Sequence, residues 1–143
     1  MNDKTPPRCE DAAAQVLIFF EALDQRRHGD VAKLMASDGT WHRQGRALTG
    51  PDEVAAALAT RDPARQTAHI VTNLQAELTD PGRARVRFYL LAYESRTDGG
   101  TQDAAPRLVA IRFCTDELVH GESGWRFASR ASHRHLPPEA LAR

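Results

Sequence analysis

Cysteine is scarce in this sequence, with two among 143 residues. Cys9 lies in a polar N-terminal stretch and Cys114 in an expected strand, which favours reduced thiols over a disulfide framework. No apolar run reaches the length that spans a membrane, and the first residues are polar and proline-bearing where a secretory signal needs a continuous apolar core. We therefore expect a cytoplasmic protein without a membrane partner.

The chain also lacks an excess of charge of either sign, because 19 basic residues face 19 acidic ones. Without an overall positive field, and with aromatic residues too dispersed for a stacking platform, nucleic acid is not an expected partner. A neutral partner or a small molecule fits this balance better. Arginine supplies most of the basic charge, and we interpret it as surface chemistry without functional weight.

Motifs for cofactor chemistry are missing as well. There is no glycine-rich phosphate loop, no lysine-bearing nucleotide motif and no nucleophile elbow, which argues against ATP, dinucleotide and acyl-serine chemistry. His133 and His135 stand two apart, a spacing that places both on one strand face and that can bind a metal. No third ligand accompanies them in an obvious place. We therefore predict no metal and no cofactor.

The residues present predict one domain over residues 1–143, with an ordered core at about 9–136, that begins with three helices. They are expected at about residues 10–27, 30–37 and 50–60. The apolar stripe of the first, made by Ala13, Val16, Leu17 and Phe20, reaches Asp24 at its next position. Two alternatives remain open here: Asp24 points toward the core, or Leu23 takes the buried position and Asp24 is solvated.

Strands follow the helices. A short one is expected at residues 40–43, with Trp41 as its core residue, and long ones occupy residues 67–96 as a hairpin, 107–119 and 125–135. Strict alternation would put His69 and Asn73 on one face of the first long strand. In the last strand it would put Arg130 on the other face from Phe127. The predicted fold class is α+β, with three N-terminal helices packed in the concave face of a strongly curved antiparallel sheet, a cone-shaped barrel. Because both faces of the hairpin carry apolar residues, we predict a homodimer through the outer sheet faces.

This order, with its residues, resembles the SnoaL-like branch of the nuclear-transport-factor-two-like superfamily. The matching features are Ala22-Leu23-Asp24 with Gly29-Asp30, Trp41, residues 50–54 (GPDEV), residues 69–73 (HIVTN) and residues 124–127 (GWRF). The branch includes scytalone dehydratase, bile-acid dehydratases, lindane dehydrochlorinase, polyketide cyclases and the small subunits of ring-hydroxylating dioxygenases. Fold transfers well across such a family and activity poorly.

The resemblance implies a catalytic pair. In the dehydratase-like members an aspartate at the end of the first helix and a histidine at the start of the first long strand act together, and the matching positions here are Asp24 and His69. Scytalone-type enzymes add a second histidine where this chain has Tyr93 or Glu94. In the dioxygenase small subunits the histidine and asparagine of this strand are structural, so the resemblance supports both an enzyme and a non-enzyme.

The sequence therefore supports two functions. In the first, His69 removes a proton beside a carbonyl or a leaving group, Asp24 orients the imidazole, and Tyr93 or Asn73 donates to the developing oxyanion. Such a cofactor-independent lyase or isomerase would bind an apolar or aromatic molecule among residues that include Trp41, Asn73, Tyr93 and Phe20. In the second, the protein is a non-catalytic ligand-binding or assembly domain.

Overall fold

The computed structural model describes residues 5–43 and 45–139, the side chains of residues 102 and 103 excepted. No helix within these ranges is long and apolar enough to cross a membrane. The helices and strands are, in chain order, α1 (Cys9–Asp24), α2 (His28–Lys33), β1 (Met35–Arg43), β2 (Arg46–Thr49), α3 (Gly50–Leu58), β3 (Arg65–Asp80), β4 (Arg83–Arg96), α4 (Thr101–Ala104), β5 (Arg107–Gly121) and β6 (Gly124–Leu136).

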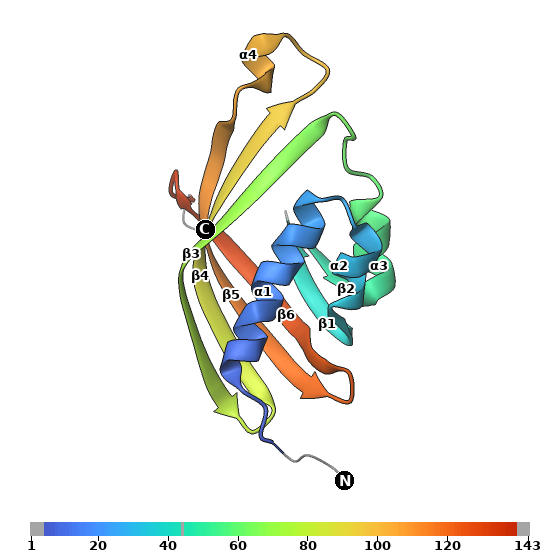
Figure 1. Cartoon of the computed structure of the whole chain (residues 1–143), viewed down its shortest axis with the longest axis vertical. Helices are drawn as coiled ribbons and strands as arrows, with labels where there is room; N and C mark the ends of the chain where they lie inside the picture. Colours follow the sequence, from blue (N-terminus) through green and yellow to red (C-terminus); the bar gives the residue numbers. More distant parts are fainter. Residues whose placement is uncertain (1–4, 44, 140–143) are drawn as a thin grey trace.

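The strands form one sheet in the order β2-β1-β6-β5-β4-β3. In Figure 1, α1 runs across this curved sheet, and α2 and α3 lie together beside β1 and β2. The predicted α+β class, with three N-terminal helices against a curved sheet, is confirmed. The sheet is mixed where the sequence predicted an antiparallel one, because β1 and β6 pair in parallel. The antiparallel meander β3 to β6 begins at the edge of the sheet farthest from β2 and ends beside β1, where β6 runs in the same direction as β1.

Several element boundaries differ from the predicted ones. A further strand follows the short one: Gly45 has a φ of 76°, and Arg46 begins β2. Pairing with β1, which Trp41 makes opposite Leu48, explains why this segment is a strand. The second helix stops at Lys33, and Ser37 belongs to β1. The short helix α4 lies between the hairpin and β5, where no helix was predicted.

The buried face of α1 is rotated relative to the predicted stripe. Val16 and Phe19 are fully buried, whereas Leu17 is 53% exposed. The ring of Phe19 makes edge contacts with Phe20, Trp41 and Phe127, all at about 5 Å between centroids. The helix therefore packs into an aromatic core on the concave side of the sheet.

Two bulges break the alternation that the sequence predicted. In β3, Asn73 has a φ of 55°, and Asn73 and Leu74 together stand opposite Phe88 of β4. The extra residue moves Leu74 and Ala76 onto the same face as His69, where they pack against the core. The apolar second half of the strand and its polar first half thus cover one concave surface.

The second bulge lies in β6. Leu118 pairs with Phe127 and Glu117 pairs with Ser129, so Ala128 is the extra residue. The predicted placement of Arg130 on the face opposite Phe127 is wrong, because the bulge brings the arginine to the concave face and buries it to 3% exposure. Arg130 finds its acidic partner, Asp116, inside the fold.

Candidate active site

The end of α1 and the start of β3 bring Asp24 and His69 into direct contact. The Nδ1 atom of His69 lies 2.6 Å from Oδ1 of Asp24. The backbone N–H of His69 donates to Oδ2 of the same carboxylate at 2.8 Å, and the Thr67 hydroxyl donates to Oδ1 at 2.8 Å. A carboxylate only accepts, so Nδ1 carries a proton and Nε2 is the basic nitrogen of the neutral ring.

Both alternatives for the end of α1 are partly realised. Leu23 occupies the buried position, at 5% exposure. Asp24 nevertheless turns toward the sheet, and its side chain is 20% exposed beside the 13% of His69. One turn of helix presents Leu23 to the core and the next residue to β3, which the helical stripe alone did not predict.

The surroundings keep the Asp24 carboxyl ionised and hold the two side chains in a fixed orientation. Partial burial alone would raise the pKa of the Asp24 carboxyl, but hydrogen bonds and charge from His69, with a further bond from Thr67, lower that pKa below its usual value. The ring of Phe20 lies 5.2 Å from the imidazole at an angle of 30° and fixes the plane of the ring. Asp24 therefore stays ionised at neutral pH and can stabilise an imidazolium.

A guanidinium group supports the pair from outside. Arg61 donates to the Leu23 carbonyl oxygen and to the Thr67 hydroxyl, at 3.1 Å each. It thereby ties the end of α1 to the first residues of β3, the two segments that supply the carboxylate and the imidazole. Arg61 is a positioning residue that the sequence reasoning missed.

His69 lines a cavity of about 700 Å³ between α1, the β1–β2 hairpin and the concave face of the sheet. This volume lies within the range of small-molecule sites. Apolar side chains from helix and strands form part of the wall, among them Phe20, Leu23, Trp41, Leu90 and Val109. The predicted contributions of Phe20 and Trp41 to the cavity are therefore matched by their positions.

Asn73 and Tyr93 do not line this cavity. His69 pairs with Ala92 across β3 and β4, so the next residue, Tyr93, lies on the convex face opposite Ala68. Asn73 is displaced from the His69 face by the bulge that it forms and lies beside a small depression with Tyr89 and Phe113. Neither side chain can donate to an oxyanion formed at His69.

The remaining candidates do not form a second site. His133 and His135 lie against Phe113 and Tyr89, respectively, and within the described part of the chain no group of three or more His, Cys, Asp and Glu residues could hold a metal. Cys114 lines the cavity as a free thiol, but burial raises its pKa to about 12. A thiol with this pKa is a poor nucleophile at neutral pH.

A curved sheet and an N-terminal helix enclose an open cavity, with His69 in its wall and Asp24 bound to the imidazole; this is the cone-shaped α+β arrangement of the NTF2-like fold. Residues 12–131 match the SnoaL-like domain. The chain belongs to the SnoaL-like family. Among curated proteins, none matches its sequence significantly.

Solved structures share the fold at low sequence identity. A Catenulispora acidiphila protein in complex with S-DNPA has a TM-score of 0.73 and 22% identity, covering 88% of this chain and 92% of that chain. An NTF2-like protein with a cystatin-like fold from Novosphingobium aromaticivorans has a TM-score of 0.73 and 15% identity, covering 88% and 80%. The hexachlorocyclohexane dehydrochlorinase LinA-type3 from Novosphingobium barchaimii has a TM-score of 0.71 and 19% identity, covering 88% and 86%.

Proposed function

We propose that this protein is a cofactor-independent lyase or isomerase that uses His69 as its general base and Asp24 as the residue that orients and charges that base. The observation that carries the proposal is the 2.6 Å contact between His69 Nδ1, in a residue that lines the cavity, and Oδ1 of Asp24. Nε2 is then free to accept a proton from a bound molecule. With this base in place, the proton transfer requires no cofactor, only a substrate with an acidic C–H bond.

The proposed step moves one proton. Nε2 of His69 takes a proton from a carbon next to a carbonyl group, and the electron pair of the broken C–H bond moves into the carbonyl as an enolate. In an isomerisation the proton returns at another carbon; in an elimination the electron pair expels a leaving group from the neighbouring carbon. Asp24 balances the imidazolium charge while the intermediate exists.

One structural neighbour supports this chemistry, and another supports small-molecule binding. The LinA-type3 protein is a dehydrochlorinase, an enzyme of the elimination class, and the Catenulispora acidiphila protein is in complex with the small molecule S-DNPA. Because Asn73 and Tyr93 lie outside the cavity, we assign the oxyanion to the arginine side chains of the wall instead. The alternative, a non-catalytic binding domain, would use the same cavity without the proton transfer.

Deuterium exchange into a bound ketone tests the proposal. The protein is incubated in D₂O with 2-tetralone, whose benzylic C1–H bond next to the carbonyl is acidic, together with related aromatic ketones, and the C1 proton signal is followed by NMR. We expect that signal to decay faster than in buffer alone. Binding of S-DNPA is measured beside it by tryptophan fluorescence, to which Trp41 in the cavity wall contributes. Tight binding with exchange at the buffer rate would favour the non-catalytic alternative.

We further propose that two copies associate through the convex face of the sheet. Ile70 and Leu108 are 48% and 43% exposed on this side, and Tyr89, Phe113 and His135 form a ring cluster there. An apolar outer face of this kind is typical of an isologous interface. Light scattering should give twice the 15.8 kDa chain mass at micromolar concentration, and Ile70→Arg should reduce it to a single chain. A single-chain mass for the unaltered protein would refute the dimer.

A further inference from the structure

The cavity has a charge of its own although the chain as a whole has none. Among the residues that the structure describes, Glu139 is the one carboxylate that lines it, whereas six arginines do so: Arg43, Arg46, Arg61, Arg65, Arg112 and Arg130. The 19 basic and 19 acidic residues of the chain are thus distributed unevenly. A neutral apolar ligand would not require this concentration of guanidinium groups.

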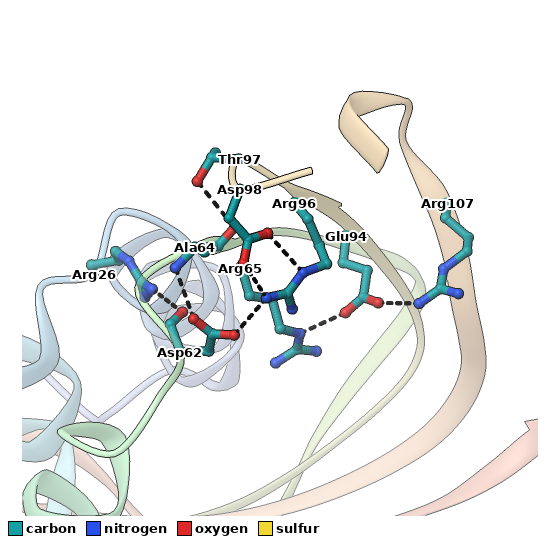
Figure 2. Close-up of polar contacts among 9 residues, drawn as sticks. All are labelled: Arg26, Asp62, Ala64, Arg65, Glu94, Arg96, Thr97, Asp98 and Arg107. Atoms are coloured by element: carbon teal, nitrogen blue, oxygen red, sulfur yellow. Dashed lines mark hydrogen bonds and ion pairs between the residues drawn. The ribbon is translucent and has the colours of Figure 1, made fainter. Parts of the chain in front are cut away.

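Three of the six arginines already have carboxylate partners. Arg65 donates to Glu94 at 2.5 Å, and Figure 2 shows that Glu94 is shared with Arg107. The other two pairs are the buried one of Arg130 with Asp116 and the 3.7 Å contact of Arg112 with Glu139. Each of these three guanidinium groups therefore lies beside a carboxylate, and Arg65 shares its carboxylate with Arg107.

The acids at the rim are also occupied. Figure 2 shows Asp62 and Asp98 both bound to Arg96, at 2.8 and 2.9 Å. Asp62 also accepts a bond at its backbone carbonyl oxygen from Arg26. These carboxylates therefore hold the rim of the cone together and leave the lining cations unbalanced.

The other three, Arg43, Arg46 and Arg61, have no carboxylate partner among the described residues; Arg46 is exposed, whereas Arg43 and Arg61 are partly buried. The Cζ atom of Arg43 lies 5.2 Å from the Trp41 ring centroid, a cation–π contact. Arg61 donates to the neutral oxygens of Leu23 and Thr67, and the Asp24 charge near it is already bound to His69.

Their environment disfavours two bare cations. Burial lowers the pKa of both guanidinium groups, and the positive charge of Arg65 lowers it further in each case. Arg61 is also exposed to the charge of Arg43. An anion between these side chains would offset the repulsion and supply the negatively charged acceptor that the described residues do not.

We propose that the cavity binds a small molecule in which an apolar or aromatic body carries a carboxylate group, and that Arg43 and Arg61 bind that carboxylate. The apolar body lies against Phe20, Trp41 and Leu90, and charge-assisted hydrogen bonds to the guanidinium groups fix its orientation. Because Arg61 also braces the segments that carry Asp24 and His69, a carboxylate held there presents a defined edge of the ligand to the imidazole. The inference rests on the proposed function in taking this cavity as the substrate site.

The matched probes are naphthalene-2-carboxylate and naphthalene-2-carboxamide, which differ in charge and share their shape. Isothermal titration should show roughly tenfold or tighter binding of the carboxylate. Raising sodium chloride from about 50 to about 500 mM should weaken the binding of the carboxylate and leave the affinity for the carboxamide unchanged. The measurement does not depend on catalysis, so a protein without proton-transfer activity can still pass it.

Variants locate the binding site. Arg43→Met and Arg61→Met, made separately, should each lower the affinity for the carboxylate by roughly tenfold and leave the affinity for the carboxamide unchanged. Arg83→Met removes the same charge from an exposed position outside the cavity and should change neither. Thermal unfolding checks that each variant is folded; if Arg61→Met is not, Arg43→Met alone decides. Equal affinity for both probes, failure of the carboxylate to bind, or an unchanged affinity in Arg43→Met would overturn the inference.

Discussion

Arg130→Met is expected to lower the free energy of unfolding by about 3–5 kcal/mol, because it leaves a buried carboxylate without its counter-charge. Arg130 donates two hydrogen bonds to Asp116, from Nε at 2.9 Å and from Nη2 at 2.5 Å. Asp116 is fully buried and Arg130 is 3% exposed. The guanidinium also lies over aromatic rings, with its Cζ atom 3.9 Å from the Phe19 centroid and 4.7 Å from that of Phe127.

The effect of Arg130→Met should depend on pH in a defined direction. Burial raises the pKa of Asp116, and Arg130 is the group that opposes this rise. Without the arginine, folded Asp116 binds its proton more tightly than it does in the unfolded chain. The folded state then holds more protons in the range between the two pKa values, so the stability of the variant rises as the pH falls through that range.

Chemical denaturation at two pH values measures both effects. Arg126→Met is the matched control, since Arg126 lies on the same strand and makes no ion pair with any described residue; we expect it to change stability by about 0.5 kcal/mol or less. The double variant Asp116→Leu/Arg130→Met should recover most of the loss, because apolar side chains can replace a buried ion pair at little cost. A small loss in Arg130→Met at neutral pH would show that the pair is not a major contributor to stability.

This ion pair also shows where prediction from the sequence stops. The helix order, the hairpin and the last strand were predicted from periodicity and turn residues. The approach of His69 to Asp24 was predicted from the family resemblance. Arg130 was placed on the wrong face, because nothing in the sequence around Ala128 marks the extra residue of a bulge. A register shift of one residue reverses which side chains are buried.

Asn73 offered a better signal. Asparagine adopts positive φ more readily than most residues, and its φ of 55° forms the bulge in β3. Interpreted in this way, it would have predicted that Leu74 and Ala76 join the face of His69, and it would have removed Asn73 from the list of ligand contacts. The arginine lining had no such signal, since Arg43, Arg61 and Arg112 come from three distant segments that only the folded cone brings together.

The second large effect is expected at His69. His69→Ala should lower the rate of proton transfer by about 10²–10⁴-fold, the usual contribution of a positioned general base. Ligand affinity should change little, because the carboxylate and the apolar body are bound by other side chains of the wall. The exchange rate of 2-tetralone and the binding of naphthalene-2-carboxylate, measured on the same preparation, separate the two effects. His120→Ala removes a histidine at the far end of β5, beside Trp125, and should alter neither.

Asp24→Asn extends the same prediction to the partner of His69. The substitution keeps the size of the side chain but removes the charge that balances the imidazolium, so the exchange rate should fall, by less than in His69→Ala. If Asp24 acts only through His69, the double variant Asp24→Asn/His69→Ala should exchange no more slowly than His69→Ala alone. The reason is that the effects of substituting residues that act as a unit do not add. Rates that fall multiplicatively, or an unchanged rate in His69→Ala with intact binding, would exclude the pair as the catalytic unit and leave the cone as a binding domain.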